Sequence, residues 1–201
     1  MTYSASICLA STSPRRCELL RQIGVMHVVQ PADLNENKRP GELPVEYVER
    51  LARSKAEYVW QSRRSSGLET LPVLGADTSV TADGLILGKP ADEAALLTTF
   101  ARLSGREHEV LSAVALVSDA GTNSLVSCTR VRFRAVTVDE ARKYWATGEP
   151  RDKAGGYAVQ GYGAIFIEHI AGSYSGVMGL PLAETTRLLI AVGVSVWHPE
   201  V

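Results

Sequence analysis

Residues 9–20 read LASTSPRRCELL, and this stretch joins the end of an apolar run to the start of a helical pattern. Pro14 suits the first turn of a helix, where its missing N–H is not needed, and Ser13 stands where it would cap that helix. Apolar residues at helical spacing continue up to Gly24, which suits a helix end. The stretch predicts a strand over residues 7–10, a turn and a helix. Such a unit directs free backbone N–H groups at one point.

The first turn of this predicted helix carries two arginines, Arg15 and Arg16. Cations at a helix N-terminus are unfavourable unless an anion compensates them, and the forked guanidinium group matches a phosphate well. The stretch lacks the GxxxxGK[ST] pattern of the P-loop. We interpret it as an anion site of another kind, the alternative being a helix start whose arginines are simply solvated.

The composition is that of an ordinary globular domain. The chain has 201 residues, 45% of them hydrophobic and 21% charged, which suits one domain over residues 1–201. A formal net charge of −1 gives no general attraction to nucleic acid or to an anionic membrane, so any positive field is local. Three scattered cysteines without a CxxC pair suit a reducing compartment. A secretory signal is not evident, and no apolar run approaches the ~18 residues of a membrane span. We expect a cytoplasmic protein that binds neither nucleic acid nor membrane.

Strand and helix patterns alternate along the chain. Strands are predicted at residues 7–10, 27–30, 71–76 with an extended continuation to 82, 85–87, 108–118, 123–136 and 165–170. Helices are predicted at residues 14–23, 44–64, 92–103, 138–146 and 179–192. Asp83-Gly84 marks a hairpin, and residues 172–176 read as a turn. The order indicates one α/β domain with a mixed sheet and an antiparallel insertion.

Polar side chains follow several predicted strands or stand beside turns. Glu36 lies in a polar loop after the second strand. Asp77 ends a buried strand, the position at which α/β sheets bind ligands. Lys89 stands in a turn between a glycine and a proline. Lys55 falls near the apolar stripe of the helix over 44–64, where a snorkelling side chain is the usual explanation.

The stretch 153–163 is dense in glycine without forming GxGxxG, which permits close backbone approach to a planar or phosphorylated ligand. Gln160 lies within it. Four cations with two carboxylates suit a polyphosphate bound with Mg²⁺ or Mn²⁺, because the cations neutralise phosphate oxygens while one carboxylate holds the metal and another activates water. No Ser–His–Asp set or catalytic Cys–His pair is apparent. The candidate set is Ser13, Arg15, Arg16, Glu36, Lys55, Asp77, Lys89 and Gln160.

Residues 11–20, STSPRRCELL, resemble the signature opening of the Maf family of nucleoside triphosphate pyrophosphatases. Three further blocks match that family in the right order. They are GADTSV at 75–80, GKP at 88–90, and YAVQG at 157–161 running on to GSY at 172–174 and GLPL at 179–182. The similarity covers nearly the whole chain.

The resemblance implies hydrolysis of a nucleoside triphosphate between the α and β phosphates, with a divalent cation. It also implies two lobes with a cleft between them, a twisted mixed sheet flanked by helices as in the ITPase-like fold, and a homodimer. By family pattern Asp77 is the general base and a possible contact of the metal, and Glu36 binds metal. The same pattern makes Ser13, Arg16, Lys55 and Lys89 phosphate ligands.

The same resemblance addresses substrate choice. The subgroup that hydrolyses dTTP and UTP carries Arg, Thr and Gln at three selectivity positions, which here are Arg15, Thr78 and Gln160. The Gln160 amide both donates and accepts, which suits the edge of uracil or thymine. The implied role is house-cleaning, which keeps modified nucleotides out of nucleic acid.

Two positions depart from the family pattern. Asn35 replaces the acidic residue that often precedes the loop glutamate, which bears on metal affinity, and Gly176 replaces an Asn in the late turn. Two alternatives remain open at this point. One is a pyrophosphatase for 7-methyl-GTP or non-canonical purine triphosphates. The other is a nucleotide-sensing regulatory protein, since the family has been linked to cell-division arrest.

Overall fold

The computed structural model describes residues 5–68 and 70–197 and contains a seven-stranded mixed sheet with the order β2-β1-β3-β5-β6-β7, in which β4 pairs with β3. β1 is parallel to β2 and β3, and the remaining pairs are antiparallel. The strands are β1 (Ile7–Leu9), β2 (His27–Val29), β3 (Val73–Ala82), β4 (Leu85–Leu87), β5 (Glu107–Ser118), β6 (Gly121–Phe133) and β7 (Ile167–Ala171).

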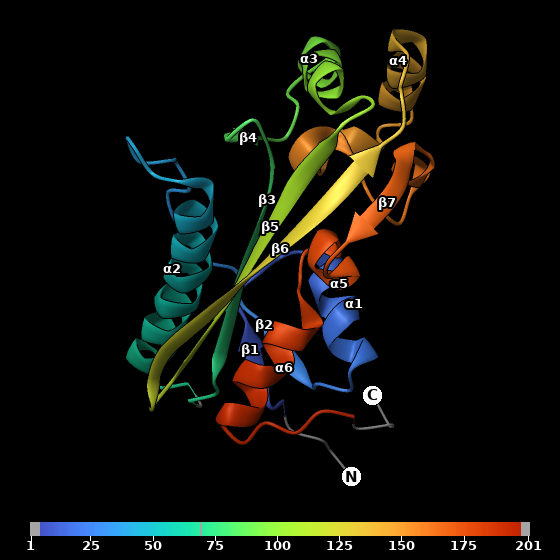
Figure 1. The fold of residues 1–201 in the computed structure, drawn as a ribbon. Coiled ribbons are helices and arrows are strands. Elements are labelled where there is room, and N and C mark those ends of the chain that lie inside the picture. The colour runs from blue at the N-terminus through green and yellow to red at the C-terminus, as the bar shows by residue number, and fades with distance from the viewer. Residues whose placement is uncertain (1–4, 69, 198–201) are drawn as a thin grey trace.

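Helices cover both faces of this sheet (Figure 1). They are α1 (Pro14–Gln22), α2 (Pro44–Ser65), α3 (Glu93–Leu103), α4 (Val138–Ala146), α5 (Tyr174–Met178) and α6 (Leu182–Ala191). Three 3-10 turns, η1 (Glu149–Asp152), η2 (Ala154–Gly156) and η3 (Tyr162–Phe166), connect α4 to β7. Among the described residues, none of the helices is both long and apolar enough to cross a bilayer.

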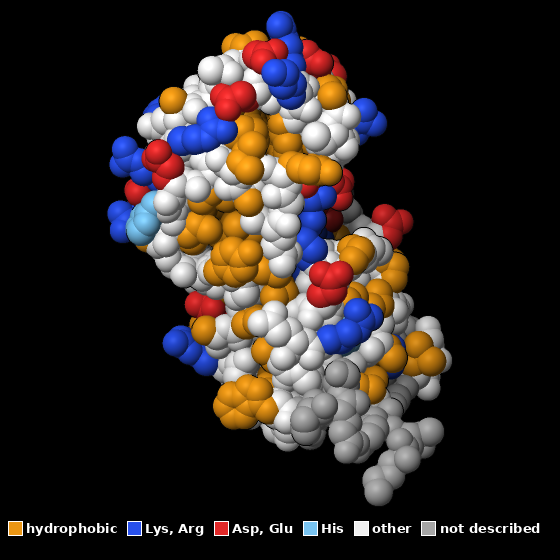
Figure 2. All heavy atoms as spheres, turned by 90° about the vertical axis from the view of Figure 1, so that its right-hand side faces the viewer, with side chains coloured by type: hydrophobic (Ala, Val, Ile, Leu, Met, Phe, Trp, Pro, Cys, Tyr) orange, Lys and Arg blue, Asp and Glu red, His pale blue; other side chains and the backbone are white. Residues whose placement is uncertain are grey.

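Two apolar cores share the long central strands. The lower core joins β1, α1 and α6 to Leu74 and Ala76 of β3, and the upper core joins α3 and α4 to Val80 and Ala82 of the same strand. β5 contributes to both cores in the same way. The result is two lobes on one sheet, and the molecule narrows between them in Figure 2. On this face acidic and basic side chains are interspersed, in keeping with the small net charge.

A third core lies on the opposite face of the sheet, under the long helix α2. Its buried residues recur at helical spacing and include Val48, Ala52, Ala56 and Val59. The helix lies very close to β3 because residue 75 is glycine. A Cβ on Gly75 would stand 2.2 Å from the Ala52 carbonyl oxygen and 2.8 Å from the Ala56 nitrogen.

Most of the local predictions are confirmed. The helix over 138–146 has the predicted bounds, and Asp92 caps α3 by accepting a hydrogen bond from Ala95 N at 2.8 Å. The hairpin between β3 and β4 turns at Asp83 and Gly84, whose φ angles are 53° and 74°. The predicted α/β class with a mixed sheet and two lobes is therefore confirmed.

Several boundaries differ from the prediction: β6 spans Gly121–Phe133 instead of 123–136, and the last helix begins at Leu182 instead of at residue 179. Three further differences have a structural cause. The strand through Asp77 does not end there, because antiparallel pairing with β5 continues to Thr81 after the parallel pairing with β1 has stopped at Leu74. The turn over 172–176 is partly helical, since α5 begins at Tyr174 and Ser173 caps it. The last strand begins at Ile167, because residues 162–166 form η3.

The contact between α2 and β3 generates a prediction about stability. Gly75→Ala forces helix and strand apart at backbone atoms, and we expect it to lower the free energy of unfolding by about 2 kcal/mol or more. The matched control is Gly88→Ala, where an added Cβ meets nothing within 4 Å. Urea denaturation compares the two variants, and equal midpoints would contradict the packing argument.

Candidate active site

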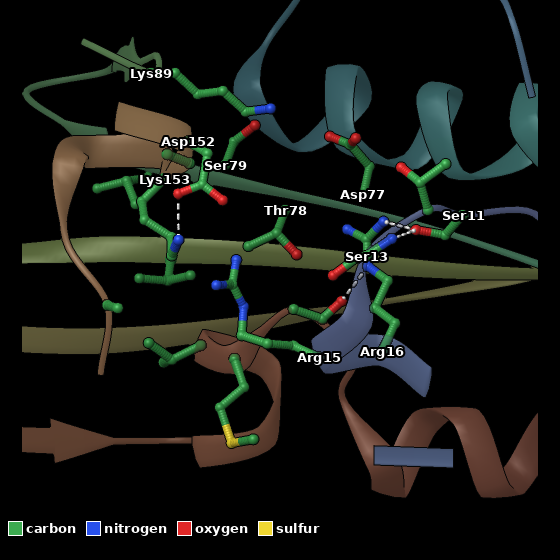
Figure 3. Close-up of a pocket in the computed structure, with 18 of the residues that line it drawn as sticks. Ser11, Ser13, Arg15, Arg16, Asp77, Thr78, Ser79, Lys89, Asp152 and Lys153 are labelled. Carbon is green, nitrogen blue, oxygen red and sulfur yellow. Dashed lines mark hydrogen bonds and ion pairs between the residues drawn. The ribbon is translucent and has the colours of Figure 1, made fainter. Parts of the chain in front are cut away.

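A cavity of about 660 Å³ lies between the two lobes. Every residue proposed from the sequence borders it: Ser13, Arg15, Arg16, Glu36, Lys55, Asp77, Thr78, Lys89 and Gln160. They come from the N-cap and first turn of α1, the loop after β2, helix α2, strand β3, the β4–α3 connection and the turn before η3. Figure 3 shows several of these side chains converging on the same space.

The centre of the cavity holds a triad of charged groups. The Lys55 ammonium Nζ lies 2.8 Å from Asp77 Oδ1 and 2.9 Å from Glu36 Oε1. Lys55 and Asp77 are 8% and 7% exposed, whereas Glu36 is exposed. The side chain of Lys55 therefore does not snorkel to the surface: it is buried and paired. Helix α2 touches Gly75 of β3 at Ala52. Lys55 lies one turn after Ala52 on the same face of the helix, so it meets Asp77, two residues after Gly75.

Asp77 is a carboxyl group whose pKa is raised. Burial is the largest cause, and the nearby Glu36 carboxylate adds to it, while Lys55 and Arg16 act in the opposite direction. A carboxylate with a raised pKa is a better proton acceptor near neutral pH than an ordinary aspartate. This is the property that a general base for water requires.

The Arg16 guanidinium group donates two hydrogen bonds within the protein. Its Nε donates to the Gly179 carbonyl oxygen at 2.8 Å, and its Nη1 donates to Ser11 Oγ at 3.0 Å. The bond to Ser11 appears as a dashed line in Figure 3. Ser13 stands at the N-cap position of α1, as predicted, but its side chain makes no capping hydrogen bond. Its backbone N–H instead donates to Ser11 Oγ at 3.2 Å.

Thr78 is fixed by a chain of hydrogen bonds from β3 to α5. Its Oγ1 lies 3.0 Å from Ser112 Oγ, which in turn donates to the Gly176 carbonyl oxygen at 2.6 Å. Gly176 N also donates to Ser173 Oγ at 3.0 Å. Both the carbonyl oxygen and the N–H of Gly176, the glycine that departs from the family pattern, are therefore hydrogen-bonded to side chains, which fixes the backbone there.

Some residues that border the cavity were not predicted. Lys153 and Asp152 form an ion pair there and are labelled in Figure 3. The position of Lys153 at the start of the glycine-dense stretch was the available signal. Tyr47 Oη donates to the Glu36 carbonyl oxygen at 2.9 Å and so holds the loop that carries this carboxylate. Nothing in the spacing of the sequence pointed to that contact.

The donor set fits a hard divalent cation in part. Asp77 and Glu36 direct carboxylate oxygens at one ammonium group, so an oxygen pair of the kind that Mg²⁺ takes together with substrate phosphates is present. Within residues 5–68 and 70–197, no group of three or more His, Cys, Asp or Glu side chains is placed to hold a metal ion. The Oδ1 of Asn35, the residue before Glu36, accepts a hydrogen bond from Asn37 N at 2.8 Å.

The fold and the cavity define a two-lobed α/β protein whose cleft is lined by more cationic than anionic side chains. The same fold is found in the Ham1 protein of Staphylococcus aureus, with a TM-score of 0.51 and 14% identity over 92% of this chain and 96% of that one. The family model described as "Maf-like protein" matches residues 6–192. The chain belongs to the Maf family, as the resemblance indicated.

Curated relatives match along almost their whole length. A protein of Bordetella parapertussis is 52% identical over 94% of this chain and 93% of its own. One of Methylobacillus flagellatus is 51% identical over 94% of both chains. One of Hahella chejuensis is 46% identical over 95% of this chain and 94% of its own. Each of the three is named "dTTP/UTP pyrophosphatase".

The charged triad generates a prediction about titration. Lys55→Met removes the ammonium that lowers the pKa of Asp77, and we expect that pKa, already raised by burial, to rise further. Carbon-13 NMR of the aspartate carboxyl, recorded without divalent metal, measures it. Lys143→Met, which removes an exposed lysine paired with Asp139 on α4, is the control. An Asp77 pKa at or below the wild-type value in Lys55→Met would contradict the assignment.

Proposed function

We propose that this chain is a nucleoside triphosphate pyrophosphatase that hydrolyses dTTP and UTP to the monophosphate and pyrophosphate. The observation that carries the proposal is the buried Asp77–Lys55 pair inside a cavity that also presents Arg15, Arg16 and Lys89. Relatives 46–52% identical over nearly the whole chain bear the name of this activity. The enzyme is thus a hydrolase acting on acid anhydrides.

The cations of the cavity are assigned to the triphosphate. Lys55 lies on α2, Lys89 lies in the β4–α3 connection, and Arg16 lies at the start of α1. Ser13, the fourth proposed ligand of the phosphates, lies beside Arg16 and has a side chain that makes no cap bond. Because these groups belong to separate elements, a bound polyphosphate would join the two lobes, and its negative charge would offset their mutual repulsion.

Asp77 is assigned as the base that takes a proton from the water attacking the α-phosphorus. Burial raises its pKa in the metal-free protein, which favours transfer of a proton from water to this carboxylate. Lys55 and Arg16 stabilise charge that develops on the phosphate oxygens. A divalent cation, Mg²⁺ or Mn²⁺, would be held by Glu36 and Asp77 and would neutralise phosphate charge there.

Arg15, Thr78 and Gln160 are assigned to recognition of the substrate and its base. Thr78 is held through Ser112, and Gln160 lies at the exposed rim of the cavity. The amide of Gln160 can match both the donor and the acceptor on the pyrimidine edge. A panel of dTTP, UTP, 7-methyl-GTP and non-canonical purine triphosphates, scored for pyrophosphate, separates this proposal from the purine alternative.

The biological setting is also part of the proposal. A house-cleaning hydrolase would act where nucleotides are made, in the cytoplasm, and the three cysteines are free, as a reducing compartment requires. We retain the homodimer as a proposal, which light scattering tests.

A nucleotide sensor would instead bind dTTP tightly and release no pyrophosphate with either metal.

Asp77→Asn tests the base. We expect pyrophosphate release from dTTP with Mg²⁺ to fall at least about a hundredfold, because general base catalysis contributes that much or more. Asp119→Asn, an exposed change in the β5–β6 turn, is the control and should leave the rate unchanged. Wild-type turnover in Asp77→Asn would remove Asp77 from this role.

Gln160→Ala tests base recognition. We expect kcat/KM for UTP to fall about tenfold relative to GTP, which corresponds to the loss of one or two hydrogen bonds. Pyrophosphate release from both nucleotides measures the ratio. An unchanged ratio would show that the Gln160 side chain does not read the base.

A further inference from the structure

The turn that carries Gln160 is held by one carboxylate outside the cavity. Gln160 lies within the turn Ala158–Gly161, which closes with a hydrogen bond from Gly161 N to the Ala158 carbonyl oxygen at 3.5 Å. On its C-terminal side, Tyr162 N donates to Glu149 Oε2 at 2.8 Å and Gly163 N donates to Glu149 Oε1 at 2.9 Å. Glu149 thus binds two successive backbone N–H groups at the start of η3.

Tyr144, which forms a hydrogen bond with Glu149, holds the N-terminal side of the same turn. Tyr144 Oη donates to Glu149 Oε1 at 2.7 Å and accepts a hydrogen bond from Ala158 N at 3.3 Å. One phenol and one carboxylate therefore fasten both sides of the turn. Neither Tyr144 nor Glu149 borders the cavity, so their effect on a bound nucleotide is indirect.

Both groups are themselves well fixed. Tyr144 is 4% exposed, and its ring packs against Phe100 and Phe166 with centroid distances of 5.7 and 5.2 Å. Glu149 follows Gly148, whose φ of 81° turns the chain at the end of α4. Burial raises the pKa of Glu149, but hydrogen bonds from Tyr144 and the two backbone N–H groups outweigh it and leave that pKa lowered. The group is therefore an ionised acceptor.

The glycines on either side of this contact leave room for it. A Cβ on Gly161 would stand 1.9 Å from Glu149 Oε2, and a Cβ on Gly163 would stand 2.7 Å from Tyr144 Oη. The missing side chains at Gly161 and Gly163 are therefore needed for contacts within the protein itself. Here the backbone approaches the carboxylate and the phenol of its own protein.

We propose that Tyr144 and Glu149 are positioning residues that hold the Gln160 turn in the orientation that selects a pyrimidine base. The inference rests on the proposed function, because it takes Gln160 as the group that meets the base. The phosphate ligands lie on other elements, so loosening this turn affects recognition of the base and leaves recognition of the triphosphate intact.

The test compares Tyr144→Phe and Glu149→Gln with Gln160→Ala. Tyr144→Phe retains the ring and removes only the hydroxyl, and Glu149→Gln retains the shape but replaces an acceptor oxygen with a donor. The matched controls are Tyr58→Phe and Glu57→Gln on the outer side of α2. Calorimetry measures Kd for the non-hydrolysable α,β-imido analogues of UTP and GTP and for inorganic triphosphate, so selectivity is read without turnover.

We expect the preference for the UTP analogue over the GTP analogue to fall at least fivefold (about 1 kcal/mol) in both positioning variants. The affinity for inorganic triphosphate should stay within about twofold of wild type, and both controls should match wild type. Hydrogen exchange of the peptide covering residues 158–163 should accelerate, while exchange in β3 and β5 stays unchanged.

Three results would overturn the inference. The first is an unchanged preference in Tyr144→Phe and Glu149→Gln while Gln160→Ala loses it. The second is a parallel loss of affinity for both nucleotides and for inorganic triphosphate, which indicates general unfolding. The third is an unchanged preference in Gln160→Ala, since the turn would then carry no selectivity to position. Failure of the proposed hydrolysis appears separately, as absent pyrophosphate release in wild-type protein that still binds the analogues.

Discussion

Helix α2 lies directly on strand β3 because Gly75 has no side chain to hold them apart. This close contact brings the stem of Lys55 beneath the sheet and places its ammonium 2.8 Å from Asp77. Burying a single carboxylate or a single ammonium group costs free energy of desolvation. The attraction between the two buried groups offsets part of that cost. The Glu36 carboxylate completes the group from the surface side. The geometry of this charged triad is therefore a consequence of how one helix packs on one strand.

The cavity exists because the two apolar cores do not meet along the central strands. β3 has Leu74 and Ala76 in the lower core and Val80 and Ala82 in the upper one. Between them the strand carries Asp77, Thr78 and Ser79, all of which border the cavity. Each lobe keeps its own packing, so the lobes stay distinct while the strands between them stay continuous. A ligand bound in the gap would contact both lobes without disturbing either core.

Around this gap, side chains that could meet a ligand are oriented by hydrogen bonds to other groups of the protein. Ser112 orients Thr78, Tyr47 holds the loop of Glu36, and Gly179 accepts a hydrogen bond from Arg16. The hydrogen-bonded Tyr144–Glu149 pair likewise contacts the backbone of the turn that carries Gln160. Supporting shells of this kind restrict the geometry of a site more than the residues in direct contact with its ligand can do alone.

Local chemistry sufficed to predict much of this protein from its sequence. The helix over 138–146, the hairpin at Asp83-Gly84 and the Asp92 cap follow from propensities acting over a few residues. The family motifs located the residues that border the cavity. Only the tertiary structure decided that Lys55 is buried against Asp77 and that Gly161 makes room for Glu149. Those contacts join residues 22 and 12 positions apart, and their distances depend on how helices and turns pack on the sheet, which periodicity along the chain does not encode.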